Sequence, residues 1–235
     1  MTIYNSLSPP APKRKTARKG PGRPEGTGDN ASERILDAAE DEFAETGYTG
    51  TSLRAISQKA GVTQALINYY FGSKYGLYEA VFIRRGRVVS DERLRRLNQL
   101  KQQADPITVE QVVRAFLEPT IALREEPAGR RFLRLQARLH TEPAEISYRL
   151  RNEAYDISTR AFVNTLLEIC PSLSAKDVNW RMALTIGAYM YAFSDTHRLD
   201  ELAPTECDPN DTKEVIEEIT AFVTAGLRAP PVYPR

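Results

Sequence analysis

The stretch TSLRAISQKAGVTQALINYYFGSK, which begins at Thr51, constrains the fold more than any other part of the chain. Thr51 or Ser52, Thr63 and Ser73 each precede a segment with apolar residues at helical spacing, as helix N-caps do. Gly61 supplies a tight turn between the first two segments. The pattern predicts two short helices joined at Gly61 and followed by a third. This is the layout of a helix-turn-helix unit, whose second helix is shaped to enter the major groove of DNA.

The composition narrows the class of protein. Hydrophobic residues make up 41% and charged residues 27% of the chain, which is ordinary for a globular protein with a buried core. Only Cys170 and Cys207 occur, too few for a disulfide framework or a four-cysteine zinc site. No apolar run approaches the roughly 20 residues that span a bilayer, and no apolar segment follows the basic N-terminus as in a secretory signal. We therefore expect a cytoplasmic protein.

Apolar periodicity and proline positions predict an all-α fold of about nine helices, with no strand and no internal repeat. Asn30 and Glu33 resemble a capping box for the first helix. Pro119 is expected to kink the helix that contains it. Besides the two short helices on either side of Gly61, helices are predicted at residues 31–46, 74–104, 108–124, 130–140, 143–170, 175–197 and 212–227.

The charge distribution separates the N-terminus from the rest of the chain. Residues 1–30 carry a net charge of +4 and the remaining residues −3, an asymmetry common in nucleic-acid-binding proteins. A segment rich in proline, glycine and basic residues is expected to be a disordered arm. We accordingly divide the chain into the arm at 1–28, a helix-turn-helix domain at 29–78, a connecting helix at 79–104 and a C-terminal domain at 105–235.

The helix that follows Thr63 is predicted to carry base-reading groups on its solvent face. Gln64, Ala65 and Asn68 lie opposite Ile67 at helical spacing. Amide side chains can bond bidentately to adenine, and Arg54 in the preceding helix can contact guanine. Hydroxyl groups, an ammonium group and free backbone N–H groups suit phosphates, and such groups gather at the helix starts. The predicted phosphate-binding residues are Thr51, Ser52, Thr63, Tyr69, Tyr70 and Lys74.

The alternative is a helical hairpin that only packs, with Tyr69 and Tyr70 as surface or core aromatic residues. Three capped helix starts, the Gly61 turn and the terminal Phe-Gly-Ser-Lys step occur in the order that a DNA-reading unit requires. The order of these features favours DNA binding.

Residues 35–81 resemble the DNA-binding domain of the TetR family of bacterial transcriptional regulators. The resemblance implies a homodimeric regulator with a C-terminal domain, from about residue 105, that binds a small molecule and forms the dimer. Ala65 stands where the family often has glycine and Asn68 where tyrosine is frequent, so the family's base preference is not carried over. The segment from Asn68 to Lys74 looks most like the branch with regulators of fatty-acid metabolism and multidrug-responsive repressors. The matching residues are Phe43, Gly47, Tyr48, Thr51, Ser52, Ile56, Ala60, Gly61, Val62, Tyr69, Phe71, Ser73, Lys74, Leu77, Ala80 and Val81.

The basic arm contains the tripeptide Gly22-Arg23-Pro24. A flat segment of this kind can lie in a narrow A·T-rich minor groove, where the negative potential attracts the arginine. We predict that Arg23 enters the minor groove beside the operator. The alternative is a solvated linker whose charge only aids solubility.

The last two long helices are predicted to form a subunit interface. Small residues at spacings of 4 or 5 let another helix approach closely, and the final helix offers an apolar face. Two such helices from each subunit would make a four-helix interface with two-fold symmetry. The alternative is that these faces are buried within one subunit. The predicted interface residues are Ala183, Gly187, Tyr191, Ile219, Phe222 and Val223.

A small-molecule pocket between the C-terminal helices is predicted from aromatic residues interspersed with a few polar ones. The alternative for each residue is ordinary core packing. By resemblance to the fatty-acid branch, the effector is expected to be apolar or amphipathic, with an acyl compound as one candidate. The predicted lining comprises Phe116, Thr120, Phe132, Gln136, His140, Tyr148, Tyr155, Phe162, Trp180 and Met190.

Catalysis is not predicted. The chain has two histidines, His140 and His197, and lacks metal-ligand spacing, a phosphate-binding glycine loop and a nucleophile elbow. No cofactor or metal is expected. The sequence predicts a sequence-specific DNA-binding regulator, a repressor released from a palindromic operator by its effector. The alternatives are an architectural DNA-binding protein that uses the basic arm, and a ligand-binding protein or enzyme with a vestigial DNA head.

Overall fold

The computed structural model describes residues 27–193 and 198–232 of the chain. Over these residues the fold is all-α, as predicted, with ten α-helices, two short 3-10 helices and no strand. Most of the predicted arm, with Arg23, and His197 lie outside the described residues.

The N-terminal helices are α1 (Thr27–Gly50), α2 (Leu53–Ala60), α3 (Gln64–Phe71) and α4 (Lys74–Lys101). Helices α2, α3 and α4 begin directly after the predicted cap residues, whereas α1 begins before its predicted cap. The hydroxyl oxygens of Ser52, Thr63 and Ser73 accept hydrogen bonds from backbone N–H groups at 3.1, 3.3 and 3.0 Å. Gly61 closes α2 with φ of 65°, a conformation that glycine adopts without strain. Asn30 is a correction, because α1 begins at Thr27 and Asn30 lies inside it.

The C-terminal helices follow the predicted order. They are α5 (Val109–Ile121), η1 (Ala122–Glu125), α6 (Pro127–Arg138), η2 (Leu139–Thr141), α7 (Ala144–Ile169), α8 (Ala175–Phe193), α9 (Arg198–Leu202) and α10 (Thr212–Arg228). Thr108 and Gln111 form a complete capping box at the start of α5. Pro119 lies within α5, and the chain tightens into η1 directly after Ile121. The five-residue helix α9 was not predicted, because its segment is short and polar.

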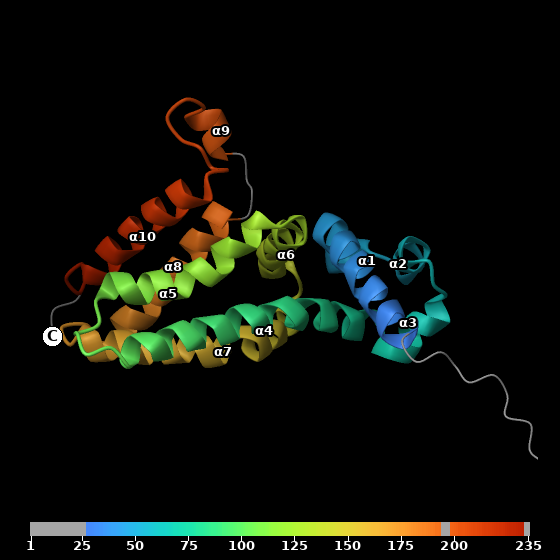
Figure 1. Cartoon of the computed structure of the whole chain (residues 1–235), viewed down its shortest axis with the longest axis horizontal. Helices are drawn as coiled ribbons and strands as arrows, with labels where there is room; N and C mark the ends of the chain where they lie inside the picture. Colours follow the sequence, from blue (N-terminus) through green and yellow to red (C-terminus); the bar gives the residue numbers. More distant parts are fainter. Residues whose placement is uncertain (1–26, 194–197, 233–235) are drawn as a thin grey trace, which may run out of the picture.

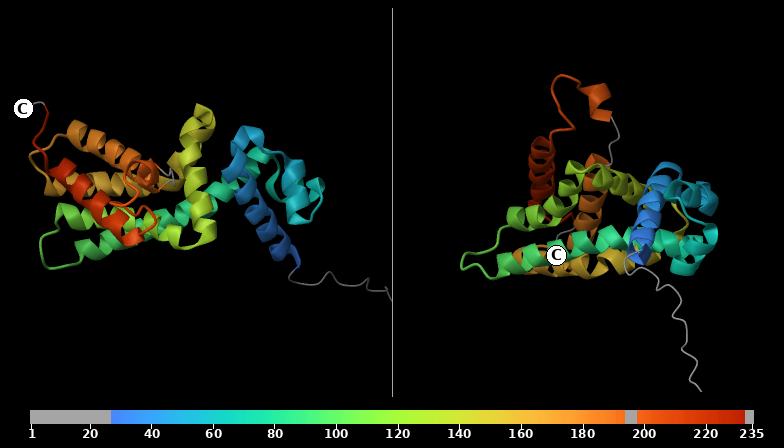
Figure 2. Two further views of the ribbon diagram at one scale, coloured as in Figure 1. Left: turned by 90° about the horizontal axis from the view of Figure 1, so that it is seen from above. Right: turned by 45° about the vertical axis from the view of Figure 1, so that its right-hand side comes forward.

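The helices form an elongated molecule with the helix-turn-helix unit at one end (Figure 1). Helix α4 has 28 residues, so it spans about 42 Å and joins the two ends. It packs along α7, while α5 packs on α10, and α6 lies beside α1 at the junction (Figures 1 and 2). Helices α4 and α6 therefore connect the C-terminal helices to α1–α3.

One hydrophobic core continues from the head, which comprises α1–α3, into the body, which comprises α4–α10. Phe43 of α1 and Ile67 of α3 belong to the same buried cluster as Phe132 of α6 and Tyr155 of α7. A second cluster fills the space between α5, α7, α8 and α10. The division at residue 78 stays a prediction, and the first cluster crosses it.

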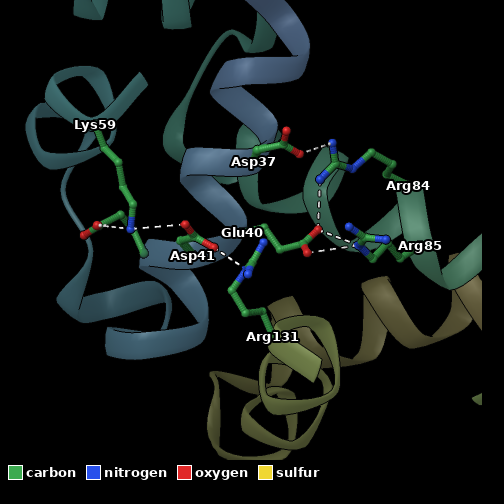
Figure 3. Close-up of polar contacts among 8 residues, drawn as sticks. Asp37, Glu40, Asp41, Lys59, Arg84, Arg85 and Arg131 are labelled. Carbon is green, nitrogen blue, oxygen red and sulfur yellow. Dashed lines mark hydrogen bonds and ion pairs between the residues drawn. The ribbon is translucent and has the colours of Figure 1, made fainter. Parts of the chain in front are cut away.

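A seam of ion pairs fixes α1 against α4 and α6 (Figure 3). Glu40 is only 1% exposed, and its carboxylate accepts hydrogen bonds from Arg84 Nη2 at 2.9 Å and Arg85 Nε at 2.8 Å. Asp41 pairs with Arg131 of α6 and lies 3.3 Å from Lys59 Nζ of α2. A buried carboxylate needs such partners, and these ion pairs link α1 to α2, α4 and α6.

Candidate functional site

The exposed face of α3 carries the predicted base-reading residues. Gln64, Ala65 and Asn68 are exposed, whereas Ile67 on the opposite side is fully buried in the head core. Arg54 of α2 is exposed as well. Among the described residues, no side-chain hydrogen bond or ion pair holds Arg54, Gln64 or Asn68. The donors and acceptors of this face are therefore available to an outside partner.

Groups suited to phosphates flank that face. The hydroxyls of Ser52 and Thr63 are exposed, and each accepts a cap hydrogen bond. Since a hydroxyl accepts and donates at once, both O–H groups can still donate to a phosphate oxygen. Tyr69 is 75% exposed and makes an edge contact with the half-buried Tyr70, their ring centroids 5.3 Å apart.

Thr51 is not placed where the phosphate prediction needs it. The side chain is buried, and its hydroxyl donates to the Gly47 carbonyl oxygen at 2.7 Å. The Oγ1 atoms of Thr51 and Thr46 are also 2.7 Å apart. This hydroxyl closes the turn after α1, and Ser52 takes the exposed position of the pair. The sequence offered two adjacent hydroxyl residues, and only the tertiary packing separated their roles.

Lys74 begins α4, the helix that joins α1–α3 to the C-terminal helices. Its Nζ lies 4.6 Å from the centre of the Tyr48 ring and 3.4 Å from the Thr49 carbonyl oxygen. Partial burial lowers the pKa of Lys74, and the nearby Glu142 carboxylate acts in the opposite direction. Glu142, just after η2, accepts a hydrogen bond from the Tyr48 backbone N–H at 2.7 Å. Sequence reasoning assigned no role to Glu142, because its partner is 94 residues away.

A cavity of about 380 Å³ lies between α4, α6, η2, α7 and α8. Five predicted pocket residues line it: Gln136, His140, Tyr148, Tyr155 and Met190. Gln136 Nε2 donates to the Tyr155 hydroxyl at 3.0 Å, and burial raises the pKa of Tyr155 well above its ordinary value. The Tyr155 hydroxyl therefore stays protonated and can act as a hydrogen-bond donor inside the cavity.

The other predicted pocket residues lie elsewhere. Phe116 and Phe162 pack edge to face in the body core, and Phe132 belongs to the core that continues into the head. Thr120 is fully buried and accepts a hydrogen bond from Arg93. Trp180 is 63% exposed on α8. The alternative of ordinary core packing describes Phe116, Phe132, Phe162 and Thr120, but it did not predict the exposed Trp180.

Sequence reasoning missed two arginines that line the cavity, Arg93 of α4 and Arg151 of α7. Arg93 lies in the charged run DERLRR, which suggests a solvated face. The available signal was its spacing, because Arg93 stands midway between the buried Val89 and Leu97, four residues from each.

The predicted dimer face divides into two groups. Ala183, Gly187, Tyr191 and Phe222 are exposed on α8 and α10, with Phe222 70% exposed. Ile219 and Val223 instead are buried within the subunit, against the body core. The exposed apolar strip also includes Trp180 and Leu184. An exposed apolar strip of this kind is typical of an interaction surface.

Two classes of site find no support in the described part of the chain. None of its helices is long and apolar enough to cross a membrane. Residues 27–193 and 198–232 also hold no group of three or more His, Cys, Asp or Glu side chains placed to bind a metal ion.

Sequence comparisons match both ends of the molecule. A family model described as bacterial regulatory proteins, tetR family, matches residues 35–81. A second, described as the C-terminal domain of tetracyclin-repressor-like proteins, matches residues 114–226. The first range contains α2 and α3, and the second contains most of the cavity lining.

Curated relatives resemble a part of the chain. The transcriptional regulator BetI of Vibrio vulnificus is 45% identical over 58 residues, which cover 25% of this chain and 29% of BetI. The regulator RutR of Escherichia coli K12 is 36% identical over 85 residues, covering 36% of this chain and 38% of RutR. The matched segments thus span about a third of these relatives.

Solved structures share the fold over most of the chain. The fatty acid degradation regulator FadR of Bacillus halodurans is 16% identical, with a TM-score of 0.57 and coverage of 88% of this chain and 99% of that one. A TetR-like transcriptional regulator from Rhodococcus sp. RHA1 is 21% identical, with a TM-score of 0.53 and coverage of 84% and 95%. At these identities the likeness concerns the fold.

Proposed function

The chain belongs to the TetR family of bacterial transcriptional regulators, and from this premise we propose that it is a homodimeric repressor of the cytoplasm. In this proposal it binds a palindromic operator and is released by a small-molecule effector. The observation that carries the proposal is the exposed face of α3, where Gln64 and Asn68 offer amide groups held by no described residue. Exposed cap hydroxyls at Ser52 and Thr63 flank it.

Base reading is assigned to Gln64, Asn68 and Arg54, and contact with a thymine methyl group to Ala65, which is exposed on the same face. Phosphate binding is assigned to Ser52, Thr63, Tyr69, Tyr70 and Lys74.

Dimerisation is supported by the apolar strip on α8 and α10. Phe222 and Trp180 are 70% and 63% exposed, and exposed aromatic rings on an apolar strip are typical of an interaction surface. A two-fold pairing of this strip would present two α3 helices to successive major grooves, about one helical turn apart.

Release by an effector requires a connection between the cavity and α3. His140 of η2 lines the cavity, and Glu142 two residues later binds the backbone of Tyr48. The Tyr48 ring in turn contacts Lys74 at the start of α4. A ligand that moves η2 or α4 would thereby change the spacing of the two heads. The effector acts only if it binds the released state more tightly than the DNA-bound state.

The test is selection from a random DNA library with purified protein at about 150 mM salt, which suppresses non-specific phosphate binding. We expect enrichment of an inverted repeat. Binding without enrichment would contradict the proposal and favour an architectural DNA-binding protein. Removing residues 1–28 in a second selection tests whether the arm containing Arg23 adds an A·T preference beside the repeat.

A further inference from the structure

We propose that the cavity beside α4 binds a small organic carboxylate and that Arg93 is the residue that holds its carboxylate group. The proposal rests on the proposed function, in which this cavity receives the effector, and it names the chemical class of that effector.

Arg93 is a buried charge with no counter-charge among the described residues. Its side chain is only 1% exposed, yet it lines the cavity. Nε donates to the Phe116 carbonyl oxygen at 2.8 Å and Nη2 to the Thr120 hydroxyl at 2.9 Å. Both acceptors are neutral, and no carboxylate in the described part of the chain pairs with it. A buried cation without an anionic partner is costly and rarely retained unless something else neutralises it.

The geometry leaves the outer edge of the guanidinium unused. A guanidinium carries five N–H donors, and the bonds to Phe116 and Thr120 use one at Nε and one at Nη2. Both N–H groups of Nη1 and one of Nη2 remain. These form the fork that matches the two oxygens of a carboxylate. The Phe116 ring, 3.7 Å from the Arg93 Cζ atom, holds the guanidinium plane in place.

The remaining charges in the cavity also favour an anion. Arg151 lines the same space, and its partners among the described residues are the Ser147 carbonyl oxygen, by a hydrogen bond, and the Tyr148 ring. Asp156 is the one carboxylate in the described lining, and it is paired with Arg160 at 3.2 Å. Partial burial and the charge of Arg151 lower the pKa of His140, as expected in a positive environment.

The rest of the lining defines the body of the ligand. Tyr148, Tyr155 and Tyr189 contribute aromatic rings, and Ile186 and Met190 contribute apolar surface. A flat or apolar body bearing one carboxylate therefore fits this lining better than a sugar or a polyphosphate. We favour a carboxylate over a phosphate monoester, because the planar Arg93 fork matches the two coplanar oxygens of a carboxylate.

The test compares acids with their own amides on the full chain. Thermal unfolding is measured with phenylacetate, cinnamate, indole-3-acetate and octanoate, with the corresponding primary amides, and with phenyl phosphate, all at constant ionic strength. We expect at least one carboxylate to raise Tm by about 4 °C at a tenfold excess over its Kd. The matching amide and phenyl phosphate should shift Tm by much less. If no carboxylate stabilises the protein more than its amide, the inference is wrong.

Two substitutions locate the effect. Arg93→Met should weaken carboxylate binding at least tenfold. Arg93→Lys keeps the charge but loses the fork, so its affinity for the carboxylate should lie between those of the parent chain and Arg93→Met. Arg87→Met, on the same helix but paired with Glu153 at the surface, is the matched control and should bind like the parent chain. Equal carboxylate binding by Arg93→Met would overturn the assignment. If Arg93→Met does not fold, the acid–amide comparison on the unmodified protein decides.

The selected operator separates the two proposals. If the unmodified protein binds an enriched inverted repeat and no carboxylate stabilises it, only the present inference fails. If a carboxylate binds through Arg93 but no DNA sequence is enriched, the cavity is a carboxylate site as inferred and the proposed function fails.

Discussion

Gln64 and Asn68 lie four residues apart on α3, whereas the cavity lining comes from α4, α6, η2, α7 and α8. The predicted reading face, the exposed side of α3, thus belongs to one short, capped helix, and its side chains point away from the core. The cavity exists only where five elements meet. A site built on one helix is tuned by changing exposed residues, whereas a cavity changes with every element that packs around it.

One buried charged side chain in each region shows the same difference between the head and the cavity. Glu40, at the head, receives hydrogen bonds from Arg84 and Arg85 and is fully compensated. Arg93, at the cavity, has only neutral acceptors among the described residues. The first arrangement fixes α1 on α4, and the second leaves a requirement that a ligand can meet.

The largest loss of unfolding free energy is expected from alanine substitutions at two glycines that pack against backbone, one at the start of α4 and one in α6. A Cβ added at Gly76 would overlap the Phe71 carbonyl oxygen, and one at Gly129 would overlap that of Leu123. Neither carbonyl can move without its helix, so each alanine substitution should lower the unfolding free energy by about 3 kcal/mol. Urea unfolding measures this.

Because one core joins head and body, both variants should shift a single unfolding transition. Gly226→Ala is the control, since an added Cβ there has no neighbour within 4 Å. Two separate transitions, each sensitive to only one variant, would show that the head and the body are energetically independent.

A second prediction concerns the reading face alone. Gln64→Ala and Asn68→Ala should each cost roughly 1–3 kcal/mol on the selected operator and little on random DNA, because only base contacts distinguish sequences. Titration of both DNAs by fluorescence anisotropy measures the difference. Equal losses on the two DNAs would remove base reading from these residues. Gln58→Ala, exposed on α2, serves as the amide control.

Substitutions at Thr51 and Lys74 distinguish a structural role of the first residue from an electrostatic role of the second. Thr51→Val leaves the Gly47 carbonyl without its hydroxyl donor, so it should lower the unfolding free energy by about 1–2 kcal/mol. The salt dependence of DNA binding should not change. Lys74→Gln should instead reduce the slope of log K against log salt by about 1, if Lys74 contacts a phosphate. The opposite pattern would return Thr51 to the phosphate-binding set.

The smallest change in unfolding free energy is expected from a substitution at His140. Partial burial at the cavity and the charge of Arg151 lower its pKa below the ordinary value of 6.5. The unfolded chain therefore takes up this proton first as the pH falls, so stability is lost as the pH drops below about 6.5. His140→Gln should flatten the decline in unfolding free energy between about pH 7.5 and about pH 5.5. His197→Gln, at the other histidine, is the control, and an unchanged decline in His140→Gln would contradict the assignment.

Much of the head was predictable because its signals are local. Ser52, Thr63 and Ser73 cap the helices that they precede in the sequence, and Gly61 turns the chain between α2 and α3. The exposed side of α3 follows from helical periodicity once Ile67 is placed inside. Asn30 misled because a capping pattern is not a helix start when the helix already continues through it.

The cavity was predictable only in part, since aromatic residues at helical spacing mark core and pocket alike. Gln136, His140 and Tyr155 line it, while Phe116 and Phe162 pack in the body core. Likewise, Ile219 and Val223 share the apolar face of α10 with Phe222, yet only Phe222 faces outward. Periodicity gives the face of a helix, but the neighbouring helices decide which part of that face is covered.

The sequence by itself determined the all-α class, the caps of α2–α4, the helix-turn-helix and which residues of α3 are exposed, because these depend on residues within a few turns of one another. Only the tertiary structure decided that Thr51 lies inside, that Glu142 binds Tyr48 and that Arg93 lines a cavity without a partner charge among the described residues. Each of these rests on burial or on a contact across helices, and the sequence alone does not fix how helices pack.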